Sequence, residues 1–591
     1  MKFLRVVCLA LLLFGCTKEK MSGKSGHAAS GTKVLNLAAL AKVKGFDPNQ
    51  ASDLYSGNEI ARVYEGLLQF HYLKRPYELA PNLAKSMPEV SSDGLTYKFE
   101  IKKGVMFHDN ACFPNEKGRE LVAQDFVYTI KRMADPKEQS KGWWLIDGKI
   151  AGLNEWRQKY KDTPANYKDV IEGIKATGKY TVEFKLAKPF PQFLYALAMP
   201  FTYAVPKEAV THYKGEFINN PVGTGPFVTS TYKQNNKIVY TKNPNYRDEF
   251  YPSEGSESDK SKGLLKDAGK KIPLVDKVIV NIIKEEQPRW LNFRKGNLDA
   301  MGIPTEQFDQ VMMSGKGLSD EFKAQGIIET KKVGLDITYS AFNHEHKLFK
   351  SNKALRQAMS LAYDRAQTNT MFYQGVSIPA QSIVPPNIAG HVNEFEGPYQ
   401  RLDLVKAKAK LKEAGFAEGK GLSEITYHYT YSTKSRQMAE VFAQNMAKIG
   451  IKIKPVGVTW PELVKLVNTK QTMMFAMAWG ADYPDAENFL QLLYSKNAAP
   501  GSNGANYSNP TFDSMFVKSS TMADSPERTA LYEKMYKMAA EEVPIIFGFH
   551  RVGYGLKHGW LKNHKITEFD HGVAKYYNID LSEKSKLLKN L

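Results

Sequence analysis

Cysteine is scarce in this chain of 591 residues, which contains only Cys8, Cys16 and Cys112. Cys8 lies inside an apolar leader and Cys16 at its end, so a processed chain would keep Cys112 as its only free thiol. A single thiol cannot form an internal disulfide, nor can it supply a zinc site built from thiolates. A chain of this length does not need such cross-links, because its core is large enough without them.

Long hydrophobic runs are also missing. The run at Val6–Phe14 is too short for a membrane-spanning helix, which needs roughly 20 apolar residues. Preceded by Lys2 and Arg5, this run has the proportions of a signal-peptide core. We therefore expect residues 1–15 to be a signal peptide and no other segment to cross a membrane.

The end of this leader resembles a bacterial lipobox, in which a cysteine becomes acylated. Leu13, Phe14 and Gly15 precede Cys16, although Phe14 is bulkier than the residue usually found there. The resemblance implies a lipid on Cys16, and the alternative is cleavage without lipidation. Residues 16–32 then form the lipidated cysteine and a flexible tether, because they are polar and rich in glycine and serine.

Two common catalytic signatures are incomplete. The GKS at 23–25 lacks the earlier glycine of a phosphate-binding loop, because that position is Lys18. The HEH at 344–346 lacks the H-E-x-x-H spacing that would direct both imidazoles at one metal. We therefore expect a binding protein rather than an enzyme, with no catalytic residues, no metal and no cofactor.

The chain carries an excess of positive charge, with a formal net charge of +19. Loss of the signal peptide would remove two of these charges and leave +17. Such a balance can indicate a nucleic acid, an anionic membrane or an acidic ligand. The lysines are scattered, however, and no arginine-rich stripe interleaves with aromatic residues. We interpret the excess as a solvated basic surface and expect no nucleic-acid partner.

Strand signals occur along the chain. Alternating apolar residues predict half-buried strands at 96–102 and 181–186. A β-branched run at 277–283 predicts a strand that is buried more continuously. Residues 248–271 lack any periodicity and are expected to form a surface loop.

Three helices have clear start or stop signals. The first follows Ser351 or Asn352 as a cap, and the second ends at Gly450, after which a strand begins at residue 451. The third begins with Ser525 as a cap followed by a first-turn proline. Helix–glycine–strand passages of this kind indicate an α/β fold.

Several short motifs are spread over almost the whole processed chain: GFDP at 45–48, YEGL at 64–67, SDGLTY at 92–97, AQDFVY at 123–128, PVGTGPF at 221–227, NPNY at 243–246, GNLD at 296–299, ALRQA at 354–358 and WGADY at 479–483. Each motif is weak evidence alone, but the ordered set is specific. Together and in this order, the motifs resemble those of the bacterial extracellular solute-binding proteins of family 5, the peptide, nickel and opine class. Within this family the chain is most similar to the oligopeptide-binding lipoproteins of ABC importers.

This resemblance implies a type II periplasmic-binding-protein fold of cluster C, with two α/β lobes, hinge strands and an inserted third subdomain. The ligand would be enclosed between the lobes by hinge closure. The expected segments are lobe I at 33–75, 188–335 and 555–591, the inserted subdomain at 76–187, and lobe II at 336–554.

The resemblance also implies the ligand-binding residues. In peptide-binding relatives the aspartate of the WGADY motif, here Asp482, pairs with the peptide's α-ammonium. A carboxylate enclosed between lobes loses water and needs a cation, and an ammonium group supplies charge and three donors. The alternative is that Asp482 caps a turn before Pro484. The other residues implied near the ligand are Trp479, Gly480, Tyr483, Trp143, Trp144, Leu54 and Asn343, although the tryptophan pair could equally belong to a core.

The predicted function is therefore the capture of peptides and their delivery to the permease subunits of an ABC importer. The protein is expected to work outside the cytoplasm, in the periplasm or at the cell surface, as a lipid-anchored monomer. Ligands of the same family that remain open are a nickel chelate, haem or a sugar derivative, and a lipid-anchored hydrolase is a remote alternative. Residues 473–478 offer no basic side chain to hold a peptide's C-terminus. Peptide length and C-terminal recognition therefore stay open.

Overall fold

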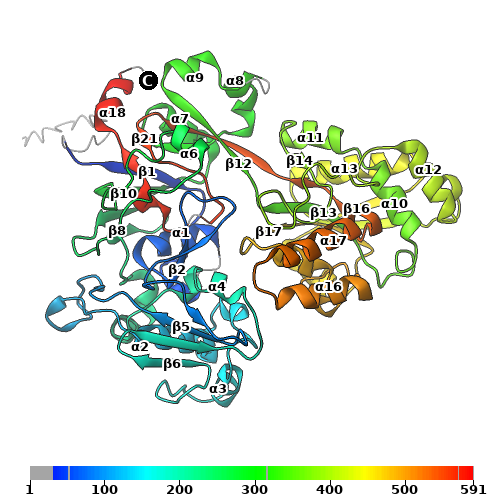
Figure 1. Ribbon diagram of the computed structural model, residues 1–591. Coiled ribbons are helices and arrows are strands. Elements are labelled where there is room, and N and C mark those ends of the chain that lie inside the picture. The colour runs from blue at the N-terminus through cyan, green and yellow to red at the C-terminus, as the bar shows by residue number, and fades with distance from the viewer. Residues whose placement is uncertain (1–30, 51–52, 314–316, 570, 590) are drawn as a thin grey trace, which may run out of the picture.

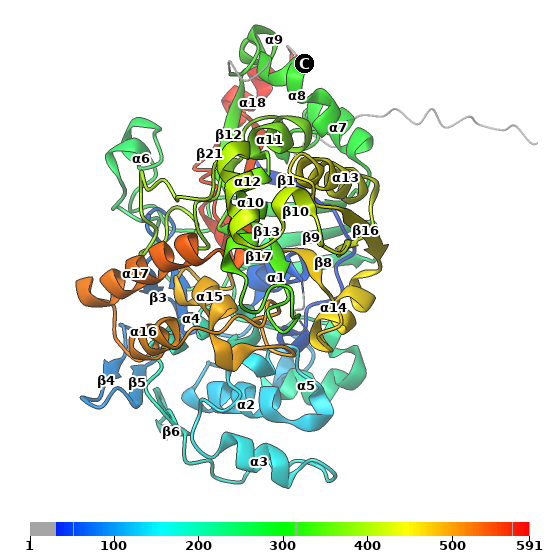
Figure 2. The same ribbon diagram turned by 90° about the vertical axis from the view of Figure 1, so that its right-hand side faces the viewer.

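The computed structural model describes residues 31–50, 53–313, 317–569, 571–589 and 591. They form two lobes joined by two crossing segments, with a subdomain at the lower end of lobe I (Figure 1). Figure 2, in which lobe II faces the viewer, places the subdomain beyond the same end of lobe I. The predicted α/β fold with two lobes and an inserted subdomain is thus confirmed. The predicted signal peptide and Cys16 lie outside the described residues.

Lobe I is built on a four-stranded sheet whose strands come from distant parts of the chain. β1 (Val34–Ala39) pairs in parallel with β10 (Lys277–Ile282), and β9 (Lys237–Lys242) and β8 (Phe227–Lys233) follow antiparallel. The predicted continuous burial of the strand at 277–283 is wrong, because burial in β10 alternates. Only one face of the strand packs into the core, while an open groove borders the other.

The inserted subdomain has a sheet of its own. Its antiparallel order is β4 (Glu89–Val90), β5 (Thr96–Glu100), β7 (Thr181–Lys185) and β6 (Ile174–Gly178). The predicted alternation is confirmed in both long strands, because their apolar side chains are buried and the intervening ones are not. The helix α2 (Ala123–Ala134) covers the sheet, with hydrophobic residues along the face that packs against it.

Lobe II contains a five-stranded sheet with helices on both faces. Its strand order is β16 (Ile453–Val458), β15 (Ile425–Thr430), β17 (Met474–Gly480), β13 (Asp336–Phe342) and β18 (Ile545–Phe547). One face packs on residues of α16 (Pro510–Ser520) and α17 (Pro526–Glu542), and the other on α10 (Lys353–Ala362) and α13 (Thr433–Ala447). Lobe II therefore has two hydrophobic cores, one on each side of the sheet.

The three predicted helix boundaries agree with the structure. Asn352 caps α10 by accepting a hydrogen bond from the Leu355 amide at 3.0 Å. Ser525 caps α17 in the same way, and Gly450 follows α13 with a positive φ of 87°. The strand after Gly450 begins two residues later than predicted. The predicted loop at 248–271 is interrupted by the short helix α6 (Glu257–Ser261), which a capping box at its N-terminus stabilises.

Two single-strand crossings join the lobes. β12 (Ile327–Val333) of lobe I leads through Gly334 into β13 of lobe II. The chain returns from β19 (Phe549–His550) through Arg551 into β20 (Val552–His558), which pairs with β12 along its whole length. The Gly334 amide donates to the Arg551 carbonyl at 2.8 Å, so the two crossings support each other. Connections this narrow suit hinge motion.

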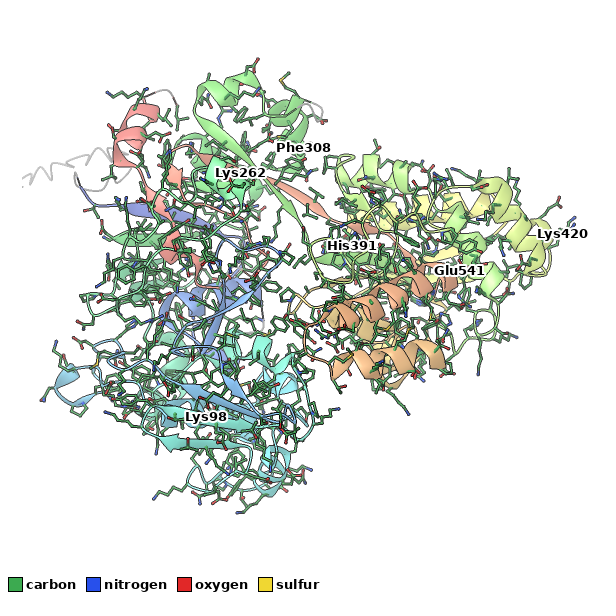
Figure 3. All side chains as sticks on the ribbon, viewed as in Figure 1. Lys98, Lys262, Phe308, His391, Lys420 and Glu541 are labelled. Atoms are coloured by element: carbon green, nitrogen blue, oxygen red, sulfur yellow. The ribbon has the colours of Figure 1, made fainter. Side chains whose placement is uncertain are left out.

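Basic side chains are distributed over the whole molecule. Lys98 lies on the inserted subdomain, Lys262 on lobe I and Lys420 on lobe II (Figure 3). This spread agrees with the scattered lysines of the sequence. In the described part of the chain, no helix combines the length and apolar character needed to span a bilayer.

Candidate ligand-binding site

Three strands of lobe II end at the same edge of the sheet, where the first crossing enters it. β15 is parallel to both β16 and β17, and β13 runs antiparallel to β17. Ligands of open α/β sheets bind outside the carboxyl ends of the strands. The residues that follow the three strands here include Tyr431, Trp460 and Asp482, and the first two are 64% and 53% exposed. This carboxyl edge is the candidate ligand-binding site.

A buried asparagine fixes the position of Asp482. The Asn488 side chain donates to the Asp482 carboxylate at 3.1 Å and accepts from the Asp482 amide at 3.0 Å. The same Asn488 oxygen accepts the Trp479 indole N–H at 3.1 Å. Asn488 lies on the short helix α15 (Glu487–Leu490) and has no exposed surface. Sequence reasoning missed it, because nothing in the local sequence marks this asparagine as a partner of the motif.

The Asp482 carboxylate is partly buried and lacks a counter-charge. Burial raises its pKa above the ordinary value, and the hydrogen bond from Asn488 opposes this shift. Among the described residues, no lysine, arginine or histidine forms an ion pair with it. The alternative of a simple turn cap leaves this desolvated charge without an explanation. The group is therefore suited to bind a cation.

The neighbouring motif residues surround Asp482 in different ways. Trp479 packs partly against the core of lobe II, and Gly480 lies exposed opposite Asp336 on β13. The Tyr483 ring stacks on Tyr195 of lobe I, with ring centroids 5.6 Å apart and planes 6° from parallel. The motif thus lies where the two lobes touch.

Three of the predicted ligand-binding residues, Leu54, Trp143 and Trp144, belong to lobe I and the inserted subdomain and make no contact with Asp482. Leu54 begins α1 (Leu54–Val63) and is 48% exposed, and Trp144 is 45% exposed. Both surfaces are free to contact a ligand. Trp143 instead packs under Arg157, whose guanidinium lies 4.6 Å from the ring centroid. No contact in the described residues brings any of the three to Asp482.

Asn343 lies elsewhere, at the far end of β13. Its side chain donates to the carbonyls of Lys470 and Thr472 at 3.0 and 2.8 Å and accepts from the Glu345 amide at 3.1 Å. It is buried, and every polar atom of its side chain is used. The geometry gives Asn343 a role in holding the loops at that end of lobe II.

A cavity of about 310 Å³ opens beside the candidate site, between the sheet and α13. Its walls are rich in hydroxyl groups and aromatic rings, with one cation, and include Ser340, Tyr373, Tyr427, Tyr429, Trp460 and Arg551. Sequence reasoning did not find these residues. Trp460, a tryptophan that follows the predicted strand after Gly450, was the one feature of the sequence that could have indicated this cavity.

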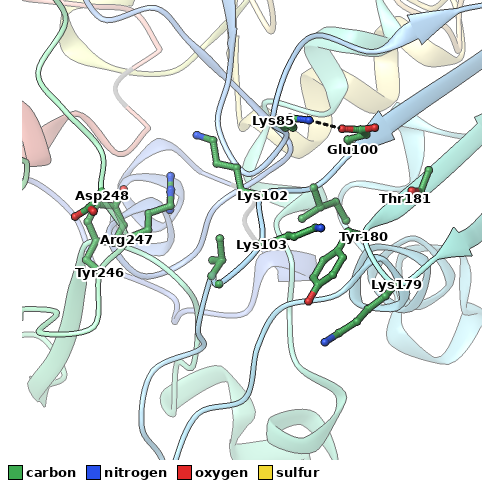
Figure 4. Close-up of a pocket in the computed structure, with 13 residues that line it drawn as sticks. Lys85, Glu100, Lys102, Lys103, Lys179, Tyr180, Thr181, Tyr246, Arg247 and Asp248 are labelled. Carbon is green, nitrogen blue, oxygen red and sulfur yellow. Dashed lines mark hydrogen bonds and ion pairs between the residues drawn. The ribbon is translucent and has the colours of Figure 1, made fainter.

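A second hollow, shown in Figure 4, lies between the inserted subdomain and residues 246–248 of lobe I and measures about 1090 Å³. Most of its charged side chains are in ion pairs, either with each other or with residues outside the hollow. Lys85 pairs with Glu100 at 2.9 Å, and Asp248 pairs with Lys271 at 2.6 Å. Fewer aromatic rings line it than line the cavity beside Asp482. This hollow is a charged boundary between the inserted subdomain and lobe I. Among the described residues that line it, no carboxylate lacks a cation as Asp482 does.

Burial also shifts the pKa values of His344, from the HEH segment, and of Cys112. Burial lowers the pKa of His344 to about 3, and its ring lies 2.9 Å from the Pro544 carbonyl. Burial raises the pKa of the Cys112 thiol to about 11, so it is not a thiolate at neutral pH. The part of the chain that the structure describes contains no cluster of three histidine, cysteine or carboxylate side chains able to hold a metal.

The chain is similar to known proteins along most of its length. The family model described as bacterial extracellular solute-binding proteins, family 5, matches residues 78–501. The chain is 27% identical to haem-binding protein A of Haemophilus influenzae, over 98% of this chain and 99% of that protein. It is 26% identical to the dipeptide-binding protein of Escherichia coli, over 88% and 90%.

A solved structure extends the comparison. The periplasmic binding protein DppA of Helicobacter pylori, in complex with the peptide STSA, superposes with a TM-score of 0.67 at 26% identity, covering 92% of this chain and 98% of that one. The type II periplasmic-binding-protein fold is therefore confirmed.

Proposed function

The chain belongs to family 5 of the bacterial extracellular solute-binding proteins, and we propose that it captures peptides for an ABC importer. Proteins of this family are solute-binding proteins and not enzymes. In the proposed cycle a peptide binds at the carboxyl edge of lobe II, and the lobes close on it. The closed protein then presents the peptide to the permease subunits as a monomer.

The carboxylate of Asp482 carries this proposal. It is partly desolvated, positioned by Asn488 and without a cation among the described residues. A peptide's α-ammonium offers a full charge and three hydrogen-bond donors at one point, which offsets the cost of taking the carboxylate from water. Backbone hydrogen bonds to an extended peptide would add affinity without demanding one sequence.

The relatives include proteins named for haem as well as for peptides, so the ligand class needs an argument of its own. Haem carries anionic propionate groups, which an unpaired carboxylate repels. Sugars lack the cation that would neutralise Asp482. Compared with haem and sugars, Asp482 thus favours a ligand with a free amino group.

We further propose that the protein works outside the cytoplasm and is attached to a membrane through a lipid on Cys16. The lipobox-like sequence before Cys16 supports this. Metabolic labelling with a clickable fatty acid is expected to mark the wild type but not Cys16→Ser. Equal labelling of both would contradict the anchor.

The ligand class can be tested without choosing a peptide sequence beforehand. Protein purified without denaturation is expected to retain short peptides, which native mass spectrometry would reveal as mass increments above the apoprotein. Calorimetry with a mixed set of peptides and with haemin would then compare affinities. Binding of haemin without binding of any peptide would overturn the proposal.

A further inference from the structure

The hollow shown in Figure 4 has more cations than carboxylates in its walls. The cations are Lys85, Lys102, Lys103, Lys179 and Arg247, and the carboxylates are those of Glu100 and Asp248. The lysines belong to the inserted subdomain and the arginine to lobe I. Positive charge therefore reaches the hollow from both bodies that meet there.

Two of these cations are left without a carboxylate. Lys85, Lys179 and Arg247 each form an ion pair, at 2.9, 3.0 and 2.6 Å. In the part of the chain that the structure describes, Lys102 and Lys103 form none. The hollow thus carries two positive charges that the surrounding carboxylates do not balance.

Lys102 is the more enclosed of the two, because its side chain is only partly exposed. Burial, and then the charge of Arg247, lower the pKa of the Lys102 ammonium. The carboxylates that oppose this shift are Glu249 and Glu65, and both are already paired with Arg247. Glu249 is also paired with Lys575, at 2.8 Å. An anion from outside the chain would therefore stabilise the charged form of Lys102.

Lys103 lies on the exposed side of the same turn. Its ammonium is 5.5 Å from the centroid of the Tyr180 ring. Figure 4 shows the Lys102 and Lys103 side chains extending in different directions from neighbouring positions of the chain. A ligand that meets both ammonium groups in these positions therefore carries two anionic groups rather than one.

The donors of the hollow favour phosphate over carboxylate. A lysine ammonium is a compact point charge that binds phosphate, whereas the planar fork of an arginine matches a carboxylate. The fork of Arg247 is already occupied by Glu65 and Glu249. The volume of about 1090 Å³ is that of sites that hold whole small molecules, and it exceeds the space that a bare ion needs.

We infer that this hollow is a second ligand site, which binds two phosphate groups of one molecule through Lys102 and Lys103. The site is independent of the proposed peptide capture, because it shares no residue with the cavity beside Asp482. The same chemistry occurs in a soluble bisphosphate and in the headgroup of a lipid with two phosphates. The bound molecule would lie at the boundary between the inserted subdomain and lobe I and balance the positive charge there.

Calorimetric titration of the full processed chain, made with Cys16→Ser so that no lipid holds it to vesicles, tests this site. The soluble probes are fructose 1,6-bisphosphate and glucose 6-phosphate. The lipid probes are phosphatidylcholine vesicles with and without cardiolipin. The bisphosphate is expected to bind about tenfold or more tightly than the monophosphate, because a second charge-assisted contact contributes at least about 1.4 kcal/mol. Lys102→Gln and Lys103→Gln should each reduce its affinity to about that of the monophosphate.

A matched control is available on the sheet of the same subdomain. Lys98 and Lys175 are exposed and lie outside the hollow. The double variant Lys98→Gln/Lys175→Gln therefore removes the same net charge as Lys102→Gln/Lys103→Gln without touching the site. The control should bind the probes as the wild type does, and the hollow variant should lose at least about tenfold.

The pattern of binding also identifies the source of the phosphates. Binding of the soluble bisphosphate, lost only in the hollow variant, would assign the site to a soluble ligand. Binding of cardiolipin vesicles alone, with the same loss, would assign it to a lipid headgroup. Equal weakening in both double variants, or no binding of either kind of probe, would overturn the inference. Lys103 is exposed, so Lys103→Gln alone keeps the test decisive if Lys102→Gln disturbs the fold.

Discussion

Buried charges have different environments in the two lobes. In lobe I, Arg247 donates to Glu65 at 2.6 and 2.9 Å and also contacts Glu249, and Lys575 donates to Glu249 at 2.8 Å. Although burial opposes it, the charges of Arg247 and Lys575 hold the pKa of Glu249 well below its usual range. In lobe II, the Asp482 carboxylate accepts a hydrogen bond from the Asn488 amide and has no ion-pair partner in the described part of the chain, and burial raises its pKa.

If the proposed function is correct, the difference separates charges that stabilise the protein from charges that bind a ligand. In the network of lobe I, Glu65, Glu249, Arg247 and Lys575 each have an oppositely charged partner, so removing one member leaves its partners buried without compensation. At the carboxyl edge of lobe II, by contrast, the described residues supply no cation to Asp482 and no anion to the Nη groups of Arg551. Mutations in the first region should affect folding, and those in the second should affect binding.

The largest effect is expected from Arg247→Met. It would leave Glu65 and Glu249 in the interior without their main partner, which costs about 3–5 kcal/mol. Chemical denaturation should therefore show a much less stable protein. Peptide affinity, measured where the variant is still folded, should stay close to that of the wild type.

Arg436→Met is the control for this experiment. Arg436 forms an exposed i,i+4 pair with Glu440, a type of interaction that contributes about 0.3–0.5 kcal/mol. A loss of stability in Arg247→Met no greater than in this control would show that the lobe I network is not structural.

An intermediate effect is expected from Asn488→Ala. The change frees the Asp482 carboxylate and the Trp479 indole from their shared partner. Affinity for a free peptide should fall about tenfold, which corresponds to about 1.4 kcal/mol. Affinity for the N-acetylated peptide should change little, because that peptide already lacks the ammonium. An equal loss for both peptides would mean that Asn488 supports the fold rather than the orientation of Asp482.

The smallest effect concerns the free protein and its dependence on pH. Burial raises the folded-state pKa of Asp482, so ionisation of this group lowers stability as the pH rises from the unfolded-state pKa to the folded-state pKa. Asp482→Asn should therefore be slightly more stable than the wild type at pH 7, because the variant does not carry the desolvated charge. The difference should vanish as the pH falls below the unfolded-state pKa of about 3.9. Urea titrations at several pH values would measure it, and a less stable variant at pH 7 would contradict the comparison.

The local parts of this structure could be predicted from sequence. Tyr97 and Phe99 alternate with polar residues and are buried on one face of β5, and Asn352 and Ser525 cap helices as expected. These features depend on neighbours within a few residues. The helix α6 was missed although its signal, Ser256 three residues before Asp259, is present in the sequence.

The site could be predicted only in part, because its partners are distant in sequence. Asp482 was assigned through the resemblance of one motif to a family. Trp460 and Arg551 join the same region only because the strand order places β16, β17 and β13 in one sheet and the return crossing beside it. The orientation of Arg551 depends on Asp336, more than 200 residues earlier. No local pattern contains that information.

The most direct test of the central claim combines Asp482→Asn with N-acetylation of a peptide that binds. Each change alone removes one partner of an enclosed ion pair, which costs about 3–5 kcal/mol. Since each 1.4 kcal/mol is about tenfold, each should weaken binding about a hundredfold or more. Calorimetry of the four combinations should show that both changes together cost much less than their sum. Equal binding of the acetylated and free peptides to the wild type would contradict the claim that Asp482 binds the α-ammonium.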